Sequence, residues 1–94
     1  MASGSGTTTE FSDQIQVYGA DWCPDCRRAK AVLDAAGVAY ADIDLEADEA
    51  AAAKAVAISG MKHIPVVVFP DGAYYVEPTN QDLALKLQAL ALAG

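Results

Sequence analysis

The chain has 94 residues, of which 53% are apolar, and a formal net charge of −7. This length suits a single domain, and the apolar content favours a packed globule over disorder. The negative charge argues against nucleic acid or an anionic membrane as a partner. No apolar run reaches the roughly eighteen residues of a membrane span.

The first residues are mostly small and polar, and we expect residues 1–12 to form a disordered tail before a domain at residues 13–94. They lack the basic region followed by an apolar one that marks a secretory signal peptide. We therefore expect a cytoplasmic protein.

The first predicted strand covers residues 14–18, where polar and apolar residues alternate. A helical spacing of apolar residues begins at Pro24, which suits the first position of a helix. Gly37 stands where glycine commonly ends a helix. Cys23 and Cys26 therefore lie at a strand-to-helix junction.

The middle of the chain predicts two more strands around a second helix. Residues 38–45 form the second strand and the alanine-rich residues 46–58 the helix. After a loop, the apolar run at residues 66–69 is typical of a strand buried on both faces.

The last third predicts a hairpin and a final helix. Pro-Asp-Gly at residues 70–72 forms a tight turn, and residues 73–76 return antiparallel. Thr79, or Asn80, caps the last helix, with Asp82 completing an approximate capping box. Five leucines would supply the packing surface of this helix: Leu83, Leu85, Leu87, Leu90 and Leu92.

The resulting order of elements is β-α-β-α-β-β-α. Strands separated by helices imply parallel crossovers, and the tight turn adds an antiparallel edge strand. We predict an α/β fold with a four-stranded mixed sheet flanked by three helices.

The two cysteines are three positions apart, so a disulfide between them would close a very small loop and contribute little stability. Chemistry explains the pair better. Thiol–disulfide exchange needs one thiolate that attacks and one thiol that resolves the mixed disulfide. Cys23, at a helix N-terminus that favours a thiolate, is the predicted nucleophile, and the more buried Cys26 is the resolving thiol. Asp25 opposes thiolate formation, and Arg27 and Arg28 could offset it.

A Cys-x-x-Cys pair also occurs in zinc sites, which need four ligands. The chain offers these two cysteines and His63, so a single chain lacks a full set of nitrogen and sulfur ligands. We expect a redox dithiol with no bound metal or cofactor.

Pro65 admits two interpretations. Alone, it is compatible with an ordinary proline at the start of a strand. Together with the cysteine pair, it predicts a cis Ile64–Pro65 bond facing the dithiol. The Ile64 backbone would then be free to pair with an extended substrate chain. Trp22, directly before the nucleophile, would form an apolar wall of the active-site groove.

The segment from Trp22 to Cys26, so soon after the first strand, resembles the glutaredoxin-like branch of the thioredoxin fold over about residues 14–92. Within that branch the chain looks closest to the mycoredoxins. These actinobacterial proteins reduce mixed disulfides formed with mycothiol. The closer likeness rests on residues 37–40, 43–46 and 64–67, the Asp71-Gly72 turn and the Thr79-Asn80 pair.

The resemblance implies a thiol–disulfide oxidoreductase that reduces mixed disulfides of proteins with a low-molecular-weight thiol as co-substrate. Asp21, Asp25 and Glu77-Pro78 replace residues that many glutathione-using glutaredoxins carry, so mycothiol is favoured over glutathione.

The same resemblance implies a set of substrate-binding residues. Pro24 lies within the motif, and Thr79 and Asn80 precede the last helix. Lys62 would pair with a carboxylate of the small thiol; a solvated loop lysine is the other interpretation.

Two other functions stay open. The first is a redoxin-type electron donor to ribonucleotide reductase, recharged by thioredoxin reductase. The second is an iron–sulfur glutaredoxin, in which two chains share a cluster through Cys23; the proline that follows disfavours it. The expected partners are protein disulfides, the small thiol and a flavin disulfide reductase, with the protein itself a monomer.

Overall fold

The computed structural model describes residues 4–7, 14–60 and 62–93. These residues contain five strands and three helices, and none of the helices is both long and apolar enough to cross a membrane. The bounds are β1 Gly4–Thr7, β2 Ile15–Gly19, α1 Pro24–Ala35, β3 Tyr40–Asp44, α2 Glu49–Ser59, β4 Val66–Val68, β5 Ala73–Val76 and α3 Asn80–Ala93. The predicted α/β architecture is confirmed, with one strand more than expected.

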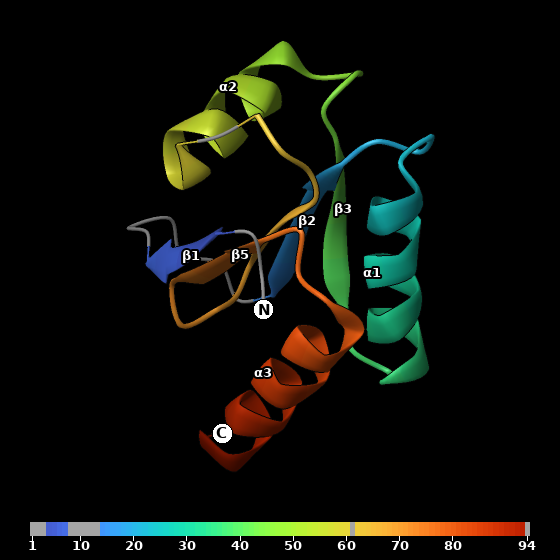
Figure 1. The fold of residues 1–94 in the computed structure, drawn as a ribbon, viewed down its shortest axis with the longest axis vertical. Helices are drawn as coiled ribbons and strands as arrows, with labels where there is room; N and C mark the ends of the chain where they lie inside the picture. Colours follow the sequence, from blue (N-terminus) through green and yellow to red (C-terminus); the bar gives the residue numbers. More distant parts are fainter. Residues whose placement is uncertain (1–3, 8–13, 61, 94) are drawn as a thin grey trace.

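The strands form a mixed sheet in the order β1-β5-β4-β2-β3 (Figure 1). β2 and β3 run parallel, and α1 makes the crossover between them. β4 pairs antiparallel with β5, as the predicted hairpin requires. It also pairs antiparallel with β2, so the expectation of parallel crossovers between strands separated by helices is confirmed for α1 and is wrong for α2. Helices α1 and α3 cover one face of the sheet, whereas α2 covers the other.

The core consists of one apolar cluster on each face of the sheet. Val17 of β2 belongs to the cluster of Leu33 in α1 and Leu83 in α3, and its neighbour Tyr18 belongs to that of Ala55 in α2. The two neighbours differ because successive side chains of a strand point to opposite faces. Leu33 and Leu83 are fully buried, and each burial stabilises the fold by roughly 1.5–3 kcal/mol.

The N-terminal segment differs from the prediction of a disordered tail. Gly4–Thr7 form β1, which pairs antiparallel with β5 along the whole of that strand. The pairing satisfies backbone groups that β5 would otherwise present at the edge of the sheet. Glycine, serine and threonine carry no apolar alternation, so the sequence held no signal for this strand. Residues 1–3 and 8–12 of the predicted tail lie outside the described residues.

Two boundary residues act as helix caps. α2 begins at Glu49, three residues later than predicted, because the carboxylate of Asp48 accepts the backbone N–H of Ala51 at 3.1 Å. Gly37, just past α1, has a φ of 70°. This left-handed conformation is the one in which glycine commonly ends a helix, as predicted.

The start of α3 has the predicted capping box. The Thr79 hydroxyl accepts the backbone N–H of Asp82, and the Asp82 carboxylate accepts that of Thr79, both at 3.0 Å. The predicted packing role of Leu85 is wrong, since its side chain is 57% exposed. A helix repeats every 3.6 residues, so leucines two positions apart cannot all face the core. Leu92 lies outside the residues whose side chains are described.

Candidate active site

The two cysteines lie where β2 ends and α1 begins. Cys23 is the N-cap residue of α1, and Pro24 is the first residue of the helix. The backbone N–H of Cys23 donates to the carbonyl of Ala20 at 3.1 Å, which closes the turn between strand and helix. Ile64 packs against Cys23 and Cys26 from the loop before β4.

Cys23 uses its sulfur as the helix cap. Its Sγ accepts the backbone N–H of Cys26 at 3.3 Å, and its side chain is 6% exposed. Unpaired N–H groups and the macrodipole at a helix N-terminus stabilise negative charge. The site therefore places the sulfur atom of Cys23 at the positive end of α1.

Cys26 lies one turn into α1 and is fully buried. Burial, as the largest cause, and the hydrogen bond with Cys23 together raise the pKa of its thiol to about 12. Both cysteines are free thiols in this structure. At neutral pH the inner sulfur is therefore protonated while Cys23 is unmodified.

Gly19, the last residue of β2, is in contact with the inner cysteine. A Cβ at this position would lie 2.6 Å from the Sγ of Cys26 and 3.1 Å from its Cβ. The strand can approach the helix this closely only because glycine has no side chain.

Gly19→Ala should lower the free energy of unfolding of the reduced protein by about 1–3 kcal/mol, the usual cost of overpacking. Denaturant unfolding measures it. The control is the same change in a Cys26→Ala background. Because this background has no Sγ for the new methyl group to clash with, Gly19→Ala should lower its free energy of unfolding much less. An equal cost in both backgrounds would show that the clash with Cys26 is not its source.

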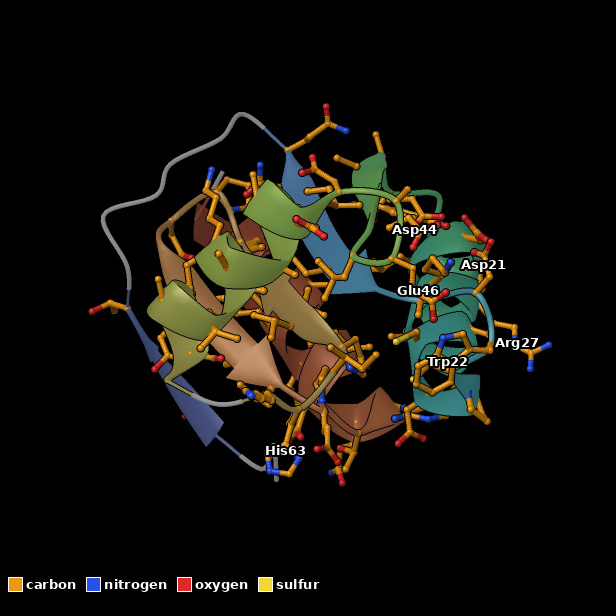
Figure 2. The ribbon with its side chains drawn as sticks, turned by 90° about the horizontal axis from the view of Figure 1, so that it is seen from above. Asp21, Trp22, Arg27, Asp44, Glu46 and His63 are labelled. Atoms are coloured by element: carbon orange, nitrogen blue, oxygen red, sulfur yellow. The ribbon has the colours of Figure 1, made fainter. Side chains whose placement is uncertain are left out.

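The Ile64–Pro65 peptide bond is cis, as the sequence predicts. The carbonyl of Pro65 accepts the backbone N–H of Glu77 at 2.9 Å, which ties this loop to the end of β5. His63 lies 64% exposed, with its Nδ1 3.1 Å from Oε1 of Glu77. The imidazole thus pairs with Glu77, and it lies well apart from Trp22 in Figure 2.

Trp22 directly precedes Cys23 and lies on the surface. Its indole is 63% exposed, and the ring N–H donates to Oε1 of Glu46 in the turn after β3 (Figure 2). The backbone N–H of Glu46 in turn donates to the carboxylate of Asp44 at 2.9 Å. The indole is therefore anchored on the turn after β3, a contact that no sequence pattern predicted.

Thr79 and Asn80 line a shallow hollow together with Arg28 and Gln81. The Arg28 guanidinium donates to Oδ1 of Asn80 at 2.6 Å and to the carbonyl of Pro78 at 2.9 Å. Sequence reasoning missed this role of Arg28, because 50 or more positions separate it from these partners.

The charged side chains near Cys23 are partly paired with one another. Arg28 also lies 3.7 Å from the carboxylate of Asp25, the acid within the cysteine motif.

Lys62 is not brought into the hollow of Thr79 and Asn80. It lines a separate apolar groove beside Ile64, on the α2 side. Across the described ranges, no three or more His, Cys, Asp or Glu side chains are grouped so as to hold a metal ion.

Comparison with known proteins gives a consistent result. The family model "Glutaredoxin" matches residues 15–74. Mycoredoxin 1 of Corynebacterium glutamicum is 33% identical over 78 residues, which cover 82% of this chain and 96% of that protein. A protein of Mycobacterium tuberculosis that carries the name glutaredoxin is 32% identical over 82% of this chain and 93% of its own. The crystal structure of a glutaredoxin from Archaeoglobus fulgidus superposes with a TM-score of 0.66 and 28% identity, covering 74% of this chain and 80% of that one.

Proposed function

The chain belongs to the glutaredoxin family of thiol–disulfide oxidoreductases, and from that premise we propose that it reduces mixed disulfides between proteins and mycothiol. The observation that carries the chemistry is the Sγ of Cys23, which caps α1 and accepts the N–H of Cys26. The choice of mycothiol is supported by the 33% identity to a mycoredoxin.

The reaction begins when the Cys23 thiolate attacks one sulfur of the mixed disulfide. A bond forms between that sulfur and Cys23 Sγ, the original S–S bond breaks, and the other partner leaves as a thiolate that takes a proton. If the small thiol stays on Cys23, a second small-thiol thiolate attacks its sulfur. This step yields the small-thiol disulfide and restores the Cys23 thiolate.

Cys26 supplies the second route. As a thiolate it attacks Cys23 Sγ in the mixed disulfide, expels the bound partner and forms the Cys23–Cys26 disulfide. Burial, the hydrogen bond that the Cys26 thiol makes with Cys23, and the charge of Cys23 raise the pKa of Cys26 in the reduced protein. Once Cys23 is in a mixed disulfide, it carries no thiolate charge, and part of the increase in the pKa of Cys26 is therefore removed. Resolution therefore becomes easier after the first attack than before it.

The small thiol would be held on the polar side of the dithiol. Thr79, Asn80 and Arg28 line a polar hollow and offer donors for its carboxylate or hydroxyl groups. Pro24, at the start of α1, is proposed as a further contact of the small thiol. The Ile64 backbone next to the cis-proline would pair with the extended protein chain. Lys62 is proposed as the partner of a substrate carboxylate, and Trp22 as an outer wall of the groove.

We further propose that the protein acts as a monomer in the cytoplasm, where thiols are kept reduced. A flavin disulfide reductase would return electrons to the oxidised small thiol. No bound cofactor takes part in this cycle.

The test is to follow reduction of a protein–mycothiol mixed disulfide with mycothiol and its reductase, with glutathione and its reductase, or with thioredoxin reductase alone. We expect turnover at least about tenfold faster with mycothiol than with glutathione, a difference of about 1.4 kcal/mol in transition-state binding. Equal turnover with both thiols would contradict the mycothiol preference. Turnover with thioredoxin reductase and NADPH alone would identify a redoxin instead.

A further inference from the structure

We propose that Lys30 of α1 promotes the resolving step by placing a fixed positive charge near the sulfur of Cys26 as this sulfur becomes a thiolate. Lys30 lies four positions after Cys26, so the two side chains are neighbours on one face of the helix. This inference rests on the proposed function and concerns its second route, in which Cys26 attacks Cys23. Lys30 is a positioning residue in this scheme, because it acts through Cys26.

The side chain of Lys30 extends toward the N-terminus of α1, where the dithiol lies. Its Nζ is 3.1 Å from Oδ2 of Asp42 in β3 and 3.9 Å from Oδ1 of Asp21, which precedes the helix. Asp21 lies beside α1 in Figure 2. Helical side chains lean toward the helix N-terminus, and the contact with Asp21 follows that direction. The ammonium group therefore reaches back over the turn that contains Cys26.

Lys30 is mostly buried, whereas its two acidic partners are not. Its side chain is 14% exposed, and those of Asp42 and Asp21 are each more than half exposed. Water and salt screen a partly buried charge less than an exposed one. The two carboxylates therefore hold the ammonium group in place, while its positive charge acts on the protein interior more strongly than their negative charges do.

Two charges act on the thiol of Cys26, and they oppose each other. Burial is the largest cause of the raised pKa of this thiol, and the charge of Cys23 also raises it. The charge of Lys30 lowers the pKa, as does the hydrogen bond with the backbone of Ala20. Once Cys23 is in a mixed disulfide, its charge is lost and that of Lys30 stays. Lys30 then favours the Cys26 thiolate at the moment when it is needed.

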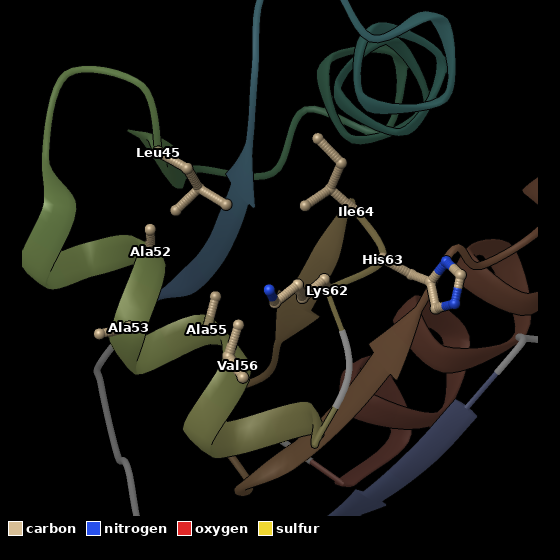
Figure 3. Close-up of a pocket in the computed structure, with 8 residues that line it drawn as sticks. All are labelled: Leu45, Ala52, Ala53, Ala55, Val56, Lys62, His63 and Ile64. Atoms are coloured by element: carbon tan, nitrogen blue, oxygen red, sulfur yellow. The ribbon is translucent and has the colours of Figure 1, made fainter.

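The other cations around the dithiol are placed differently from Lys30. Arg28 pairs with the carboxylate inside the cysteine motif, and His63 pairs with the glutamate after β5. Arg27 is exposed, and Lys62 lines the apolar groove on the α2 side (Figure 3). None of the described carboxylates around the dithiol is buried: Asp21, Asp25, Asp42, Asp44 and Glu46.

The experiment follows the reaction of the reduced protein with the symmetric disulfide of thionitrobenzoate. Attack of the Cys23 thiolate breaks the S–S bond of the reagent, leaves one thionitrobenzoate on Cys23 and releases the other as a coloured thiolate. Attack of Cys26 then forms the Cys23–Cys26 disulfide and releases the second. The rate of the first release depends on reagent concentration and that of the second does not. Cys26→Ser should show the first release only.

Lys30→Met and Lys30→Gln remove the charge and keep an unbranched side chain that favours helix. Loss of a nearby opposite charge should lower the thiolate fraction of Cys26 about tenfold. Each remaining thiolate should be about threefold more nucleophilic, so the second release should slow about threefold at neutral pH. The first release should slow less, because Cys23 lies about one turn further away and draws on the helix N-terminus. Lys30→Arg keeps the charge and should restore the second release.

A titration of the inner sulfur separates this role from a merely structural one. In a Cys23→Ser background Cys26 is the only cysteine, and the chemical shift of its labelled β-carbon reports its ionisation. Adding Lys30→Met should move the midpoint to higher pH, whereas adding Lys30→Arg should not. The matched control is Lys86→Met in α3. Lys86 is as buried as Lys30 and also pairs with a carboxylate, but it lies over the Phe69 ring and should change neither readout.

The outcomes separate the two proposals. If both releases slow equally in Lys30→Met, if the second keeps its rate, or if Lys30→Arg is as slow as the neutral variants, Lys30 does not act on the resolving step and the proposed function stands. If the wild type releases only one thiolate, Cys26 does not resolve and the role of Lys30 is lost. If it releases none, the proposed function is wrong as well.

Discussion

Replacing Cys23 by serine should abolish disulfide exchange, with a loss of at least about a thousandfold in the rate of mixed-disulfide reduction. A serine hydroxyl at the cap of α1 could still accept the N–H of Cys26, so the helix start should survive. It cannot form the thiolate or the S–S bond on which every later step depends. Loss of a nucleophile commonly costs several orders of magnitude, and steady-state turnover of a mixed disulfide measures it.

The matched control is Cys26→Ser. This variant keeps the nucleophile and loses only the route through the internal disulfide, so it should retain the reaction with the small thiol. It should also accumulate a mixed disulfide on Cys23, visible as an added mass. Equal loss in both variants would mean that resolution by Cys26 is obligatory and that the small thiol does not release the product.

Patterns local in sequence predicted the strand-to-helix junction that carries the two cysteines. A strand, a break, two cysteines and a helical spacing are all read within about 20 residues, and they locate the cap of α1 at Cys23. The cis-proline was predicted by combining Pro65 with that unit, and the structure has it. Local rules succeed here because the helix start and the turn depend on neighbouring residues only.

Contacts between distant segments could not be predicted. Arg28 meets Asn80 across 52 positions, and Trp22 meets Glu46 across 24. Such pairs depend on how α1 packs beside α3 and on the path of the turn after β3. Neither arrangement is indicated by a periodic pattern of residues in the sequence. The apolar groove beside Ile64, on the α2 side (Figure 3), was missed for the same reason, because its lining comes from three separate segments. β1 was missed because backbone pairing, not side-chain pattern, places it.

The buried thiol of Cys26 should make the reduced protein lose stability at alkaline pH. The ordinary pKa of 9.0 applies in the unfolded chain, whereas burial and the hydrogen bond with Cys23 raise it to about 12 in the folded one. Below pH 9 the thiol is protonated in both states, so it adds no pH dependence. Between pH 9 and 12 the folded state binds more protons than the unfolded state, and the free energy of unfolding therefore falls as pH rises.

The loss attributable to Cys26 should approach about 2 kcal/mol by pH 10.5, since each pKa unit is worth about 1.4 kcal/mol. Denaturant unfolding of the reduced protein at a series of pH values measures it. Tyr40, whose pKa is raised by burial and by its hydrogen bond to Asp34, adds a decline of the same sign. Cys26→Ala keeps that contribution and removes the thiol, so the difference between the two curves isolates Cys26. If the plots of unfolding free energy against pH for the wild type and Cys26→Ala run parallel from pH 8 to 11, the pKa of Cys26 is not raised by folding. Burial would then not explain why Cys23 attacks and Cys26 resolves.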